Sequence, residues 1–285
     1  MAGLFCWVVL HRNESLAGRI AYRELSPVNY MELPRAISRD RHWLRGGFPQ
    51  PLTAKNNKSA AEWMGDFIRS YVERDLNLLF GVDLTSGIIR RILSMLSYVN
   101  GAVWNAEMMA RSLGITAPTV NRYIDYLEGA FLIHRLPAFY VNTRKRLVKS
   151  PKVYIRDGGL LHQLCGVSDM ISLKGHPVVG SSWEGYVLEQ IYQLKPQGTD
   201  ISYYRTQTGA ECDIVISKGI HPVACVEIKL NNAPHISKGN LQSMADLKTK
   251  RNFIVVPDVD EFKTTGNIIV CNLHTFLSKY LPGLS

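Results

Sequence analysis

Ionisable side chains stand in two stretches of the chain that otherwise have the composition of buried β-strands. Glu211 and Asp213 fall in the first stretch, and Glu227 and Lys229 fall in the second. Strand side chains alternate between two faces, so Glu211 should share a face with Asp213, and Glu227 with Lys229. Carboxylates and an ammonium on interior strands are costly unless they pair or bind a metal. The pattern therefore indicates either a buried ion-pair network or a metal site.

The elements around these strands predict a sheet flanked by helices. Alternation also places Cys212, Ile214 and Ile216 together on the opposite face of the first strand. Further strands are expected at residues 201–205, 252–256 and 267–270, and helices at 236–249 and 273–280. With a helix before the first strand, the order α-β-β-β-α-β is typical of a mixed sheet covered by helices. The fold class is therefore mixed α/β.

The helix before the sheet should bring a third carboxylate to the strands. Ser181 or Ser182 can cap a helix that runs to about Leu194. Glu184 lies next to apolar positions of this helix, so it should border the buried face, whereas Glu189 should point elsewhere.

A helix-turn-helix is predicted in the middle of the chain. Asn105 and Thr116 are suited to cap its two helices, and Gly114 is suited to the turn between them. Apolar runs that follow predict short strands, so the unit should be a winged helix; these runs cover residues 131–136, 139–141 and 153–155. Helices at 58–80 and 88–98 are expected to be packing elements.

Positive charge favours an anionic partner such as nucleic acid. The net charge is +9, and the stretch from Arg135 to Arg156 has no Asp or Glu. The candidate phosphate contacts are Arg122, Arg144, Lys145, Arg146, Lys149 and Lys238. A basic loop on a winged helix that contacts only proteins is the other interpretation of the same charges.

Composition restricts the class of protein. The 285 residues suggest two or more units, which we place at 1–80, 81–157 and 158–285. Five cysteines without a C-x-x-C pair argue against a zinc site or a disulfide framework and fit a cytoplasmic protein. No apolar run reaches the length of a membrane span, so no membrane partner is expected.

The C-terminal unit resembles the PD-(D/E)xK nuclease superfamily, which has the restriction-endonuclease-like fold. Asp213 matches the motif aspartate, Glu227 and Lys229 match the (D/E)xK pair, and Glu184 matches the carboxylate often carried by the first helix. Cys212 stands where the motif proline is usual. The resemblance implies that Asp213 and Glu227 hold Mg²⁺ or Mn²⁺, with Glu184 and Glu211 as further metal ligands. It also implies that Lys229 orients water or neutralises charge.

Nearly the whole chain resembles the C-terminal region of a prokaryotic family of AAA-type ATPases. The matching stretches are Glu14–Arg19, Arg45–Pro49, Tyr71–Asp75, Ser150–Tyr154, Gly209–Asp213, Glu227–Lys229 and Ser237–Gly239. The P-loop pattern G-x-x-x-x-G-K-[ST] does not occur in the sequence, so no ATP is expected to bind this chain. We therefore interpret the chain as a truncated member, with residues 1–80 a remnant of the core's tail and a helical linker.

The sequence is compatible with three functions. The first is a Mg²⁺-dependent nuclease guided to DNA by the winged helix. The second is an inactive DNA- or protein-binding regulatory module, in which Glu227, Lys229 and Asp213 form an ion-pair network. The third is a fragment that requires an ATPase partner. A homo-oligomer is compatible with each of them.

Overall fold

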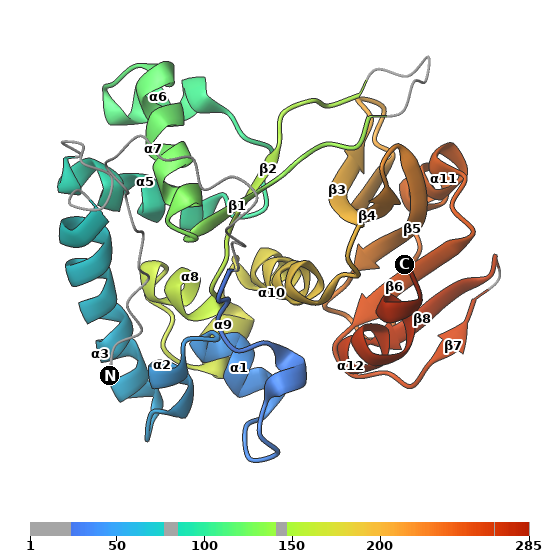
Figure 1. Cartoon of the computed structure of the whole chain (residues 1–285), viewed down its shortest axis with the longest axis horizontal. Coiled ribbons are helices and arrows are strands. Elements are labelled where there is room, and N and C mark those ends of the chain that lie inside the picture. Colours follow the sequence, from blue (N-terminus) through green and yellow to red (C-terminus); the bar gives the residue numbers. More distant parts are fainter. Residues whose placement is uncertain (1–23, 77–84, 141–146, 265, 285) are drawn as a thin grey trace, which may run out of the picture.

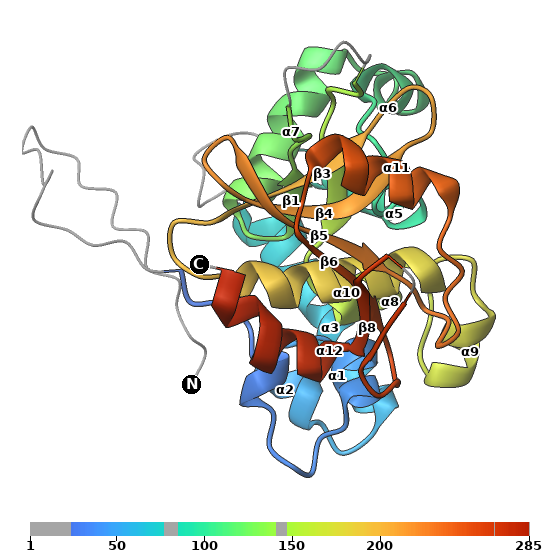
Figure 2. The same ribbon diagram turned by 90° about the vertical axis from the view of Figure 1, so that its right-hand side faces the viewer.

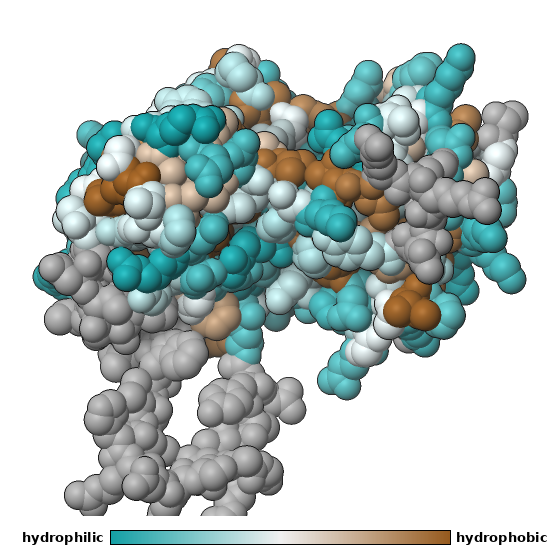
Figure 3. Space-filling model, turned by 90° about the horizontal axis from the view of Figure 1, so that it is seen from above, coloured by the Kyte–Doolittle hydropathy of each residue, from teal (hydrophilic) through white to brown (hydrophobic). Residues whose placement is uncertain are grey.

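The computed structural model describes residues 24–76, 85–140, 147–264 and 266–284. The described residues form a mixed α/β fold, as the order of predicted elements required. Helices and a two-stranded hairpin make up one part of the molecule, and a six-stranded sheet with its helices makes up the other (Figure 1). Seen from above, the helical part is mostly hydrophilic, and a hydrophobic strip lies between the two parts (Figure 3).

Short helices build the N-terminal half of the helical part. Their bounds are η1 Tyr30–Glu32, α1 Arg39–Arg45, α2 Pro49–Thr53, α3 Asn57–Phe67, a π-helix at Ile68–Asp75 and α5 Ser86–Tyr98. The helix predicted over 58–80 is therefore present up to its described end, and the helix predicted over 88–98 begins slightly earlier. Phe48 contacts the rings of Trp63 and Phe67. Met64 of α3 and Ile92 of α5 are buried in the same core cluster, so both helices pack as expected.

The two helices predicted around Gly114 are confirmed. Helix α6 spans Ala106–Leu113 and α7 spans Ala117–Gly129. The side chains of Asn105 and Thr116 accept the predicted capping hydrogen bonds from backbone N–H groups. Gly114 ends α6 in the left-handed region, with φ of 69°.

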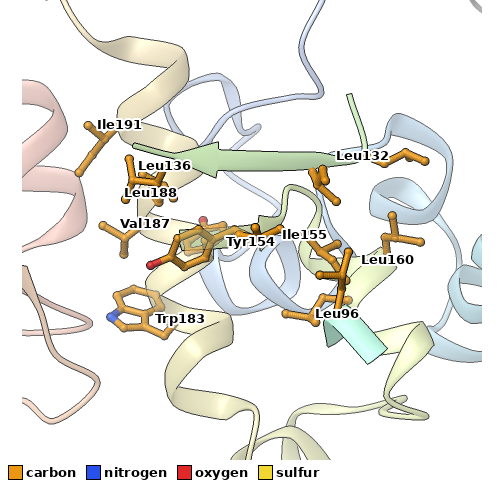
Figure 4. Packing of buried hydrophobic residues seen from close by; sticks show 14 of the residues in the cluster. Leu96, Leu132, Leu136, Tyr154, Ile155, Leu160, Trp183, Val187, Leu188 and Ile191 are labelled. Atoms are coloured by element: carbon orange, nitrogen blue, oxygen red, sulfur yellow. The ribbon is translucent and has the colours of Figure 1, made fainter. Parts of the chain in front are cut away.

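A two-stranded hairpin follows these helices. Strand β1, Ile133–Leu136, pairs antiparallel with β2, Lys152–Ile155. The strand predicted at 139–141 is not part of the hairpin: the Phe139 N–H donates to the carbonyl of Tyr203 in the large sheet, and Val141 lies outside the described residues. Figure 4 shows Tyr154 of β2 beside Trp183 and Val187 of helix α10. The hairpin is therefore packed against the helix that flanks the large sheet.

The large sheet has the strand order β3-β4-β5-β6-β8-β7. Its strands are β3 Asp200–Arg205, β4 Glu211–Lys218, β5 His221–Ile228, β6 Arg251–Val256, β7 Phe262–Lys263 and β8 Ile268–Asn272. The pairs β5-β6 and β6-β8 are parallel, and the other pairs are antiparallel. The helices of this half are α8 Gly158–Leu164, α9 Met170–Gly175, α10 Val179–Leu194, α11 Lys238–Leu247 and α12 Leu273–Thr275, with a π-helix at Phe276–Tyr280 and a 3-10 turn at Leu281–Leu284.

Helices α10 and α11 cover the two faces of this sheet (Figure 2). Val187 of α10 belongs to the larger core cluster, together with Ile214 and Val226. Met244 of α11 belongs to the smaller cluster, together with Val215. The larger cluster also contains residues of α1, α5, α7 and the hairpin, so one continuous core runs through the helical part into one face of the sheet.

A β-bulge in β4 overturns one predicted face. Ser202 pairs with Val215 and Tyr204 with Cys212, so β4 has one residue more than β3 over this interval. Cys212 therefore packs into the smaller core with Val215, whereas Ile214 packs into the larger one. The prediction that Cys212 shares a face with Ile214 and Ile216 was wrong, because simple alternation does not account for a bulge.

Candidate functional site

A buried lysine lies at the centre of the predicted acidic residues. The Nζ atom of Lys152, on β2, is 3.2 Å from Oε1 of Glu184, 3.0 Å from Oε1 of Glu211 and 3.8 Å from Oδ1 of Asp213. Lys152 is 4% exposed. Its ammonium also lies over the ring of Tyr203, 5.4 Å from the centroid. The hairpin, α10 and β4 thus each contribute to one charged cluster.

Neighbouring groups fix two of these carboxylates. The Tyr154 hydroxyl, also on β2, donates a hydrogen bond to Oε1 of Glu184, the same oxygen that faces Lys152. The backbone N–H of Ile228 donates to Oδ2 of Asp213 at 2.9 Å. Asp213 stands in the bulged part of β4, and a bulge reorients the side chains next to it. One oxygen of Asp213 therefore faces Lys152, and the other faces β5.

Glu227 and Lys229 form the second half of the site. Lys229 Nζ is 2.6 Å from Oε1 of Glu227. The side chain of Asn240 on α11 also hydrogen-bonds Glu227. The Trp183 indole N–H donates to the carbonyl of Lys229 at 3.2 Å, which holds the end of β5 against α10. The expected network of Glu227, Lys229 and Asp213 is therefore present in part: Glu227 pairs with Lys229, whereas Asp213 pairs with Lys152.

The two halves interact electrostatically. Burial, followed by the charges of Glu184 and Glu227, raises the pKa of Asp213 well above its usual value, although Lys152 opposes the shift. Burial also raises the pKa of Glu227, against the influence of Lys229. Burial would lower the pKa of Lys152, but the surrounding carboxylates outweigh it and raise that pKa. The cluster holds more acid than its lysines neutralise.

The donor set has the chemistry of a site for a hard cation. Glu184, Glu211, Asp213 and Glu227 offer only carboxylate oxygens, and the Lys152 ammonium already stands among three of them in the position of a cation. Among the described residues, no three His, Cys, Asp or Glu side chains are arranged to hold one metal ion. Mg²⁺ commonly binds through one or two carboxylates and keeps several waters. Asp213 and Glu227 supply two carboxylates, the number that Mg²⁺ commonly uses.

The predicted phosphate contacts lie outside this cluster. Arg122 on α7, Lys149 before β2 and Lys238 at the start of α11 are exposed. The remaining three, Arg144, Lys145 and Arg146, lie outside the described residues. Lys238 begins helix α11, whose Asn240 donates to the carbonyl of Glu211 at 3.4 Å.

Backbone pairing places the segment that joins β1 to β2 along β3. The Val148 N–H donates to the carbonyl of Arg205 at 3.0 Å, and the Tyr203 hydroxyl donates to the carbonyl of Ser150. With the bond from Phe139 to Tyr203, both ends of the segment are held at the edge of the large sheet. Figure 1 shows the described parts of this segment, residues 137–140 and 147–151, reaching from the hairpin to β3. Lys149 is therefore exposed at the edge of the sheet, beside β3.

A second buried ionic cluster surrounds Glu189. Glu189 is 6% exposed, and its carboxylate lies 3.0 Å from Nη2 of Arg156 and 2.9 Å from Nε2 of His134. Arg156 also pairs with Glu24 at 2.6 Å. Glu189 therefore points away from the cluster around Lys152, as predicted, but it is buried, because the hairpin and the residue after it bring its partners to α10.

The start of α10 also differs from the prediction. The helix begins at Val179, so Ser181 and Ser182 lie inside it and do not cap it. The Ser182 hydroxyl instead accepts a hydrogen bond from the Trp43 indole at 2.9 Å and lies 2.7 Å from Nε2 of His162. Ser182 thus ties α10 to α1 and α8.

Lys152 and Tyr154 were not among the predicted site residues. Both alternate with the apolar Val153 and Ile155 in a short strand, which is the same pattern that identified Glu227 and Lys229. That signal was present in the sequence. The strand that carries both residues, β2, belongs to the small hairpin, however. The local sequence pattern does not show that β2 lies close to β4.

No helix within the described ranges has the length and apolar character needed to cross a membrane. Residues 37–170 match a family model described as Domain of unknown function (DUF8612), and residues 179–276 match Domain of unknown function (DUF4143). Lys152 lies in the first match, whereas Glu184, Asp213 and Glu227 lie in the second. The charged cluster is therefore shared between the two matched regions.

Two curated relatives match most of the chain. They are Uncharacterized protein Mb2031c of Mycobacterium bovis and Uncharacterized protein Rv2008c of Mycobacterium tuberculosis. Each is 37% identical over 257 residues, which cover 90% of this chain and 57% of the relative. The chain thus spans little more than half the length of these relatives. No solved structure matches it significantly. The chain therefore joins two domains of unknown function, the second of which, DUF4143, is a family found in AAA-ATPase-associated proteins.

Proposed function

We propose that this chain is a DNA-binding protein whose residues 158–285 form a PD-(D/E)xK-type nuclease domain that hydrolyses phosphodiester bonds with Mg²⁺ or Mn²⁺. The observation that carries the proposal is the electrostatic interaction among Glu184 of α10, Asp213 of β4, Glu227 of β5 and Lys229, which directly follows β5. Their interaction is visible in the pKa of Asp213, which burial and then Glu184 and Glu227 raise. The order α10-β3-β4-β5-α11-β6 supports the same superfamily.

Each side chain has a role that its surroundings allow. Asp213 and Glu227 would hold the ion, with Glu184 and Glu211 as further oxygen ligands. Bound Mg²⁺ would supply Lewis-acid activation of water and stabilise charge on the phosphate. Lys229, held by Glu227 at 2.6 Å and about one-third exposed, can reach a substrate phosphate and neutralise charge that develops on it.

DNA is the partner that the charges favour. We propose that α6, α7 and the hairpin act as a winged helix, with Arg122 on the exposed side of α7. Lys149 and Lys238 would contact phosphates, together with Arg144, Lys145 and Arg146. The net charge of +9 supports binding to a polyanion, because phosphate contacts release counterions.

Plasmid cleavage tests this function. Purified protein with Mg²⁺ or Mn²⁺ should nick or linearise supercoiled plasmid, and EDTA, Asp213→Ala and Lys229→Ala should each abolish cleavage. Lys218→Ala is the matched control, because Lys218 is an exposed lysine at the other end of β4. Cleavage that survives in Asp213→Ala would contradict the proposal.

A regulatory module without catalysis is the second candidate. Lys152 favours it, because its ammonium pairs with three of the carboxylates that a nuclease would use for metal. Such a module would act on DNA or on an ATPase partner supplied by another chain. A salt-dependent gel shift without cleavage, unchanged in Asp213→Ala, would support this candidate over the nuclease.

A further inference from the structure

The position of Lys152 restricts how many metal ions the site can hold. Its ammonium is within 3.8 Å of Glu184, Glu211 and Asp213, and its side chain is 5% exposed. It also lies over the ring of Tyr203. A hard cation bound by these three carboxylates would have to occupy the volume that the ammonium fills.

The backbone of Lys152 is fixed on both sides. Lys152 pairs with Leu136 in the hairpin and forms a bridge with Val103. The preceding Pro151 accepts a hydrogen bond from the N–H of Trp104 at 2.7 Å, and the following Val153 bonds to Ala102. The ammonium is therefore anchored in the cluster by a rigid strand.

The excess negative charge of the cluster equals the charge of one divalent ion. Four carboxylates, Glu184, Glu211, Asp213 and Glu227, face two ammonium groups, Lys152 and Lys229, which leaves an excess of two negative charges when all are ionised. Arg205 approaches Glu211 at 3.8 Å from the solvent side, where its charge is screened. The excess is greatest at Asp213, because Lys152 lies closer to Glu184 and Glu211, and Lys229 pairs with Glu227.

We propose that Lys152 takes the place of a second divalent ion, so that the site binds a single ion between Asp213 and Glu227. This inference rests on the proposed nuclease function and refines it. Glu184 and Glu211 pair with the ammonium of Lys152, and the ion binds to Asp213 and Glu227. The cation comes from the region matched by DUF8612, while the ion's ligands come from the region matched by DUF4143. The two regions therefore complete one site together.

Counting bound ions tests the proposal. Isothermal titration of the full chain with Mn²⁺ should give one ion per chain for the wild type. Lys152→Met, which keeps an unbranched side chain of similar length but removes the charged ammonium, should bind two ions. Lys152→Arg restores the positive charge and should return the count to one. Lys218→Met, an exposed lysine on β4, is the matched control and should leave the count at one.

The unfolding temperature tests the proposal a second way, which also applies if Lys152→Met is less stable than the wild type. Without the ammonium the carboxylates repel, so this variant should unfold at a lower temperature than the wild type in EDTA. Mn²⁺ should then raise its unfolding temperature by more than it raises that of the wild type, because two ions bind the folded state. An equal or smaller rise would overturn the proposal.

The outcomes separate this inference from the proposed function. Two ions in the wild type, or one ion in Lys152→Met, would overturn the role of Lys152 while leaving a metal-dependent nuclease intact. No ion in either protein would overturn both. One ion in the wild type and two in Lys152→Met would support both.

Discussion

Helix α10 carries two carboxylates that end in opposite electrostatic surroundings. Glu189 meets Arg156 and His134, which outweigh the effect of burial and lower its pKa to about 2. Glu184 joins Asp213 around Lys152, and burial together with Glu184 and Glu227 raises the pKa of Asp213. Both clusters are buried and ion-paired. One is neutralised by its own partners, and the other is left with excess acid.

This contrast separates a structural cluster from a candidate site. A buried ion pair by itself is weak evidence of function, because it can serve only to hold elements in register. An excess of buried acid costs stability in the absence of a ligand, and a cation would remove that cost. The cluster around Asp213 has this property, whereas the cluster around Glu189 does not.

The largest effect should follow removal of Arg156. In Arg156→Met the buried Glu189 loses the guanidinium that donates to both of its oxygens, so the free energy of unfolding should fall by roughly 3–5 kcal/mol. Urea denaturation at neutral pH would measure the loss. Arg205→Met is the control, because Arg205 meets Glu211 at the solvent side and its loss should cost less than about 1 kcal/mol. Equal losses in the free energy of unfolding for the two variants would show that the buried ion pair contributes no more to stability than the exposed one.

Glu189→Gln should destabilise the protein in a pH-dependent way. Because the pKa of Glu189 is lowered to about 2 in the folded state from 4.5, its charged form stabilises the fold above pH 4.5. This contribution, roughly 3 kcal/mol by linkage, is lost as pH falls through that range toward 2. The difference in stability between wild type and Glu189→Gln should therefore shrink between pH 5 and pH 3. A constant difference would show that Glu189 acts only through packing.

Asp213→Asn should show the opposite pH dependence without metal. The raised pKa of Asp213 means that the folded state holds its proton longer, so stability is lost as pH rises through the folded pKa. In EDTA, Asp213→Asn should gain stability relative to the wild type from pH 4 to pH 8. Thermal unfolding across this range would measure it. A relative loss with rising pH would mean that Lys152 already neutralises Asp213.

The smallest effect should be stabilisation by Mg²⁺. At ten times its dissociation constant, a ligand that binds only the folded state adds about 1.4 kcal/mol. The wild type should gain this amount, and Asp213→Asn should gain none. Glu24→Gln, which removes a partner of Arg156 in the other cluster, should gain as much as the wild type. A gain that Asp213→Asn retains would place the ion elsewhere.

Much of the C-terminal fold was predictable because its signals are local. The alternation around Glu227 and Lys229 identified β5, and apolar runs identified β6 and β8. Caps at Asn105 and Thr116 identified α6 and α7. These features depend on residues within one element or its immediate ends.

The missed features depend on contacts between distant segments. Lys152 reaches the site only because β2 packs against α10 and the segment before it follows β3. Glu189 is buried because Arg156 and His134 arrive from the same hairpin. The bulge that separates Cys212 from Ile214 appears only when β4 is paired with β3. None of these follows from the pattern of a single strand or helix.

Calorimetric titration of Mg²⁺ into the wild type and into Asp213→Asn tests most directly whether the excess acid is a cation site. We predict one bound ion in the wild type and none in the variant. A wild type that takes up no ion, or a variant that binds the ion with unchanged affinity, would contradict the assignment.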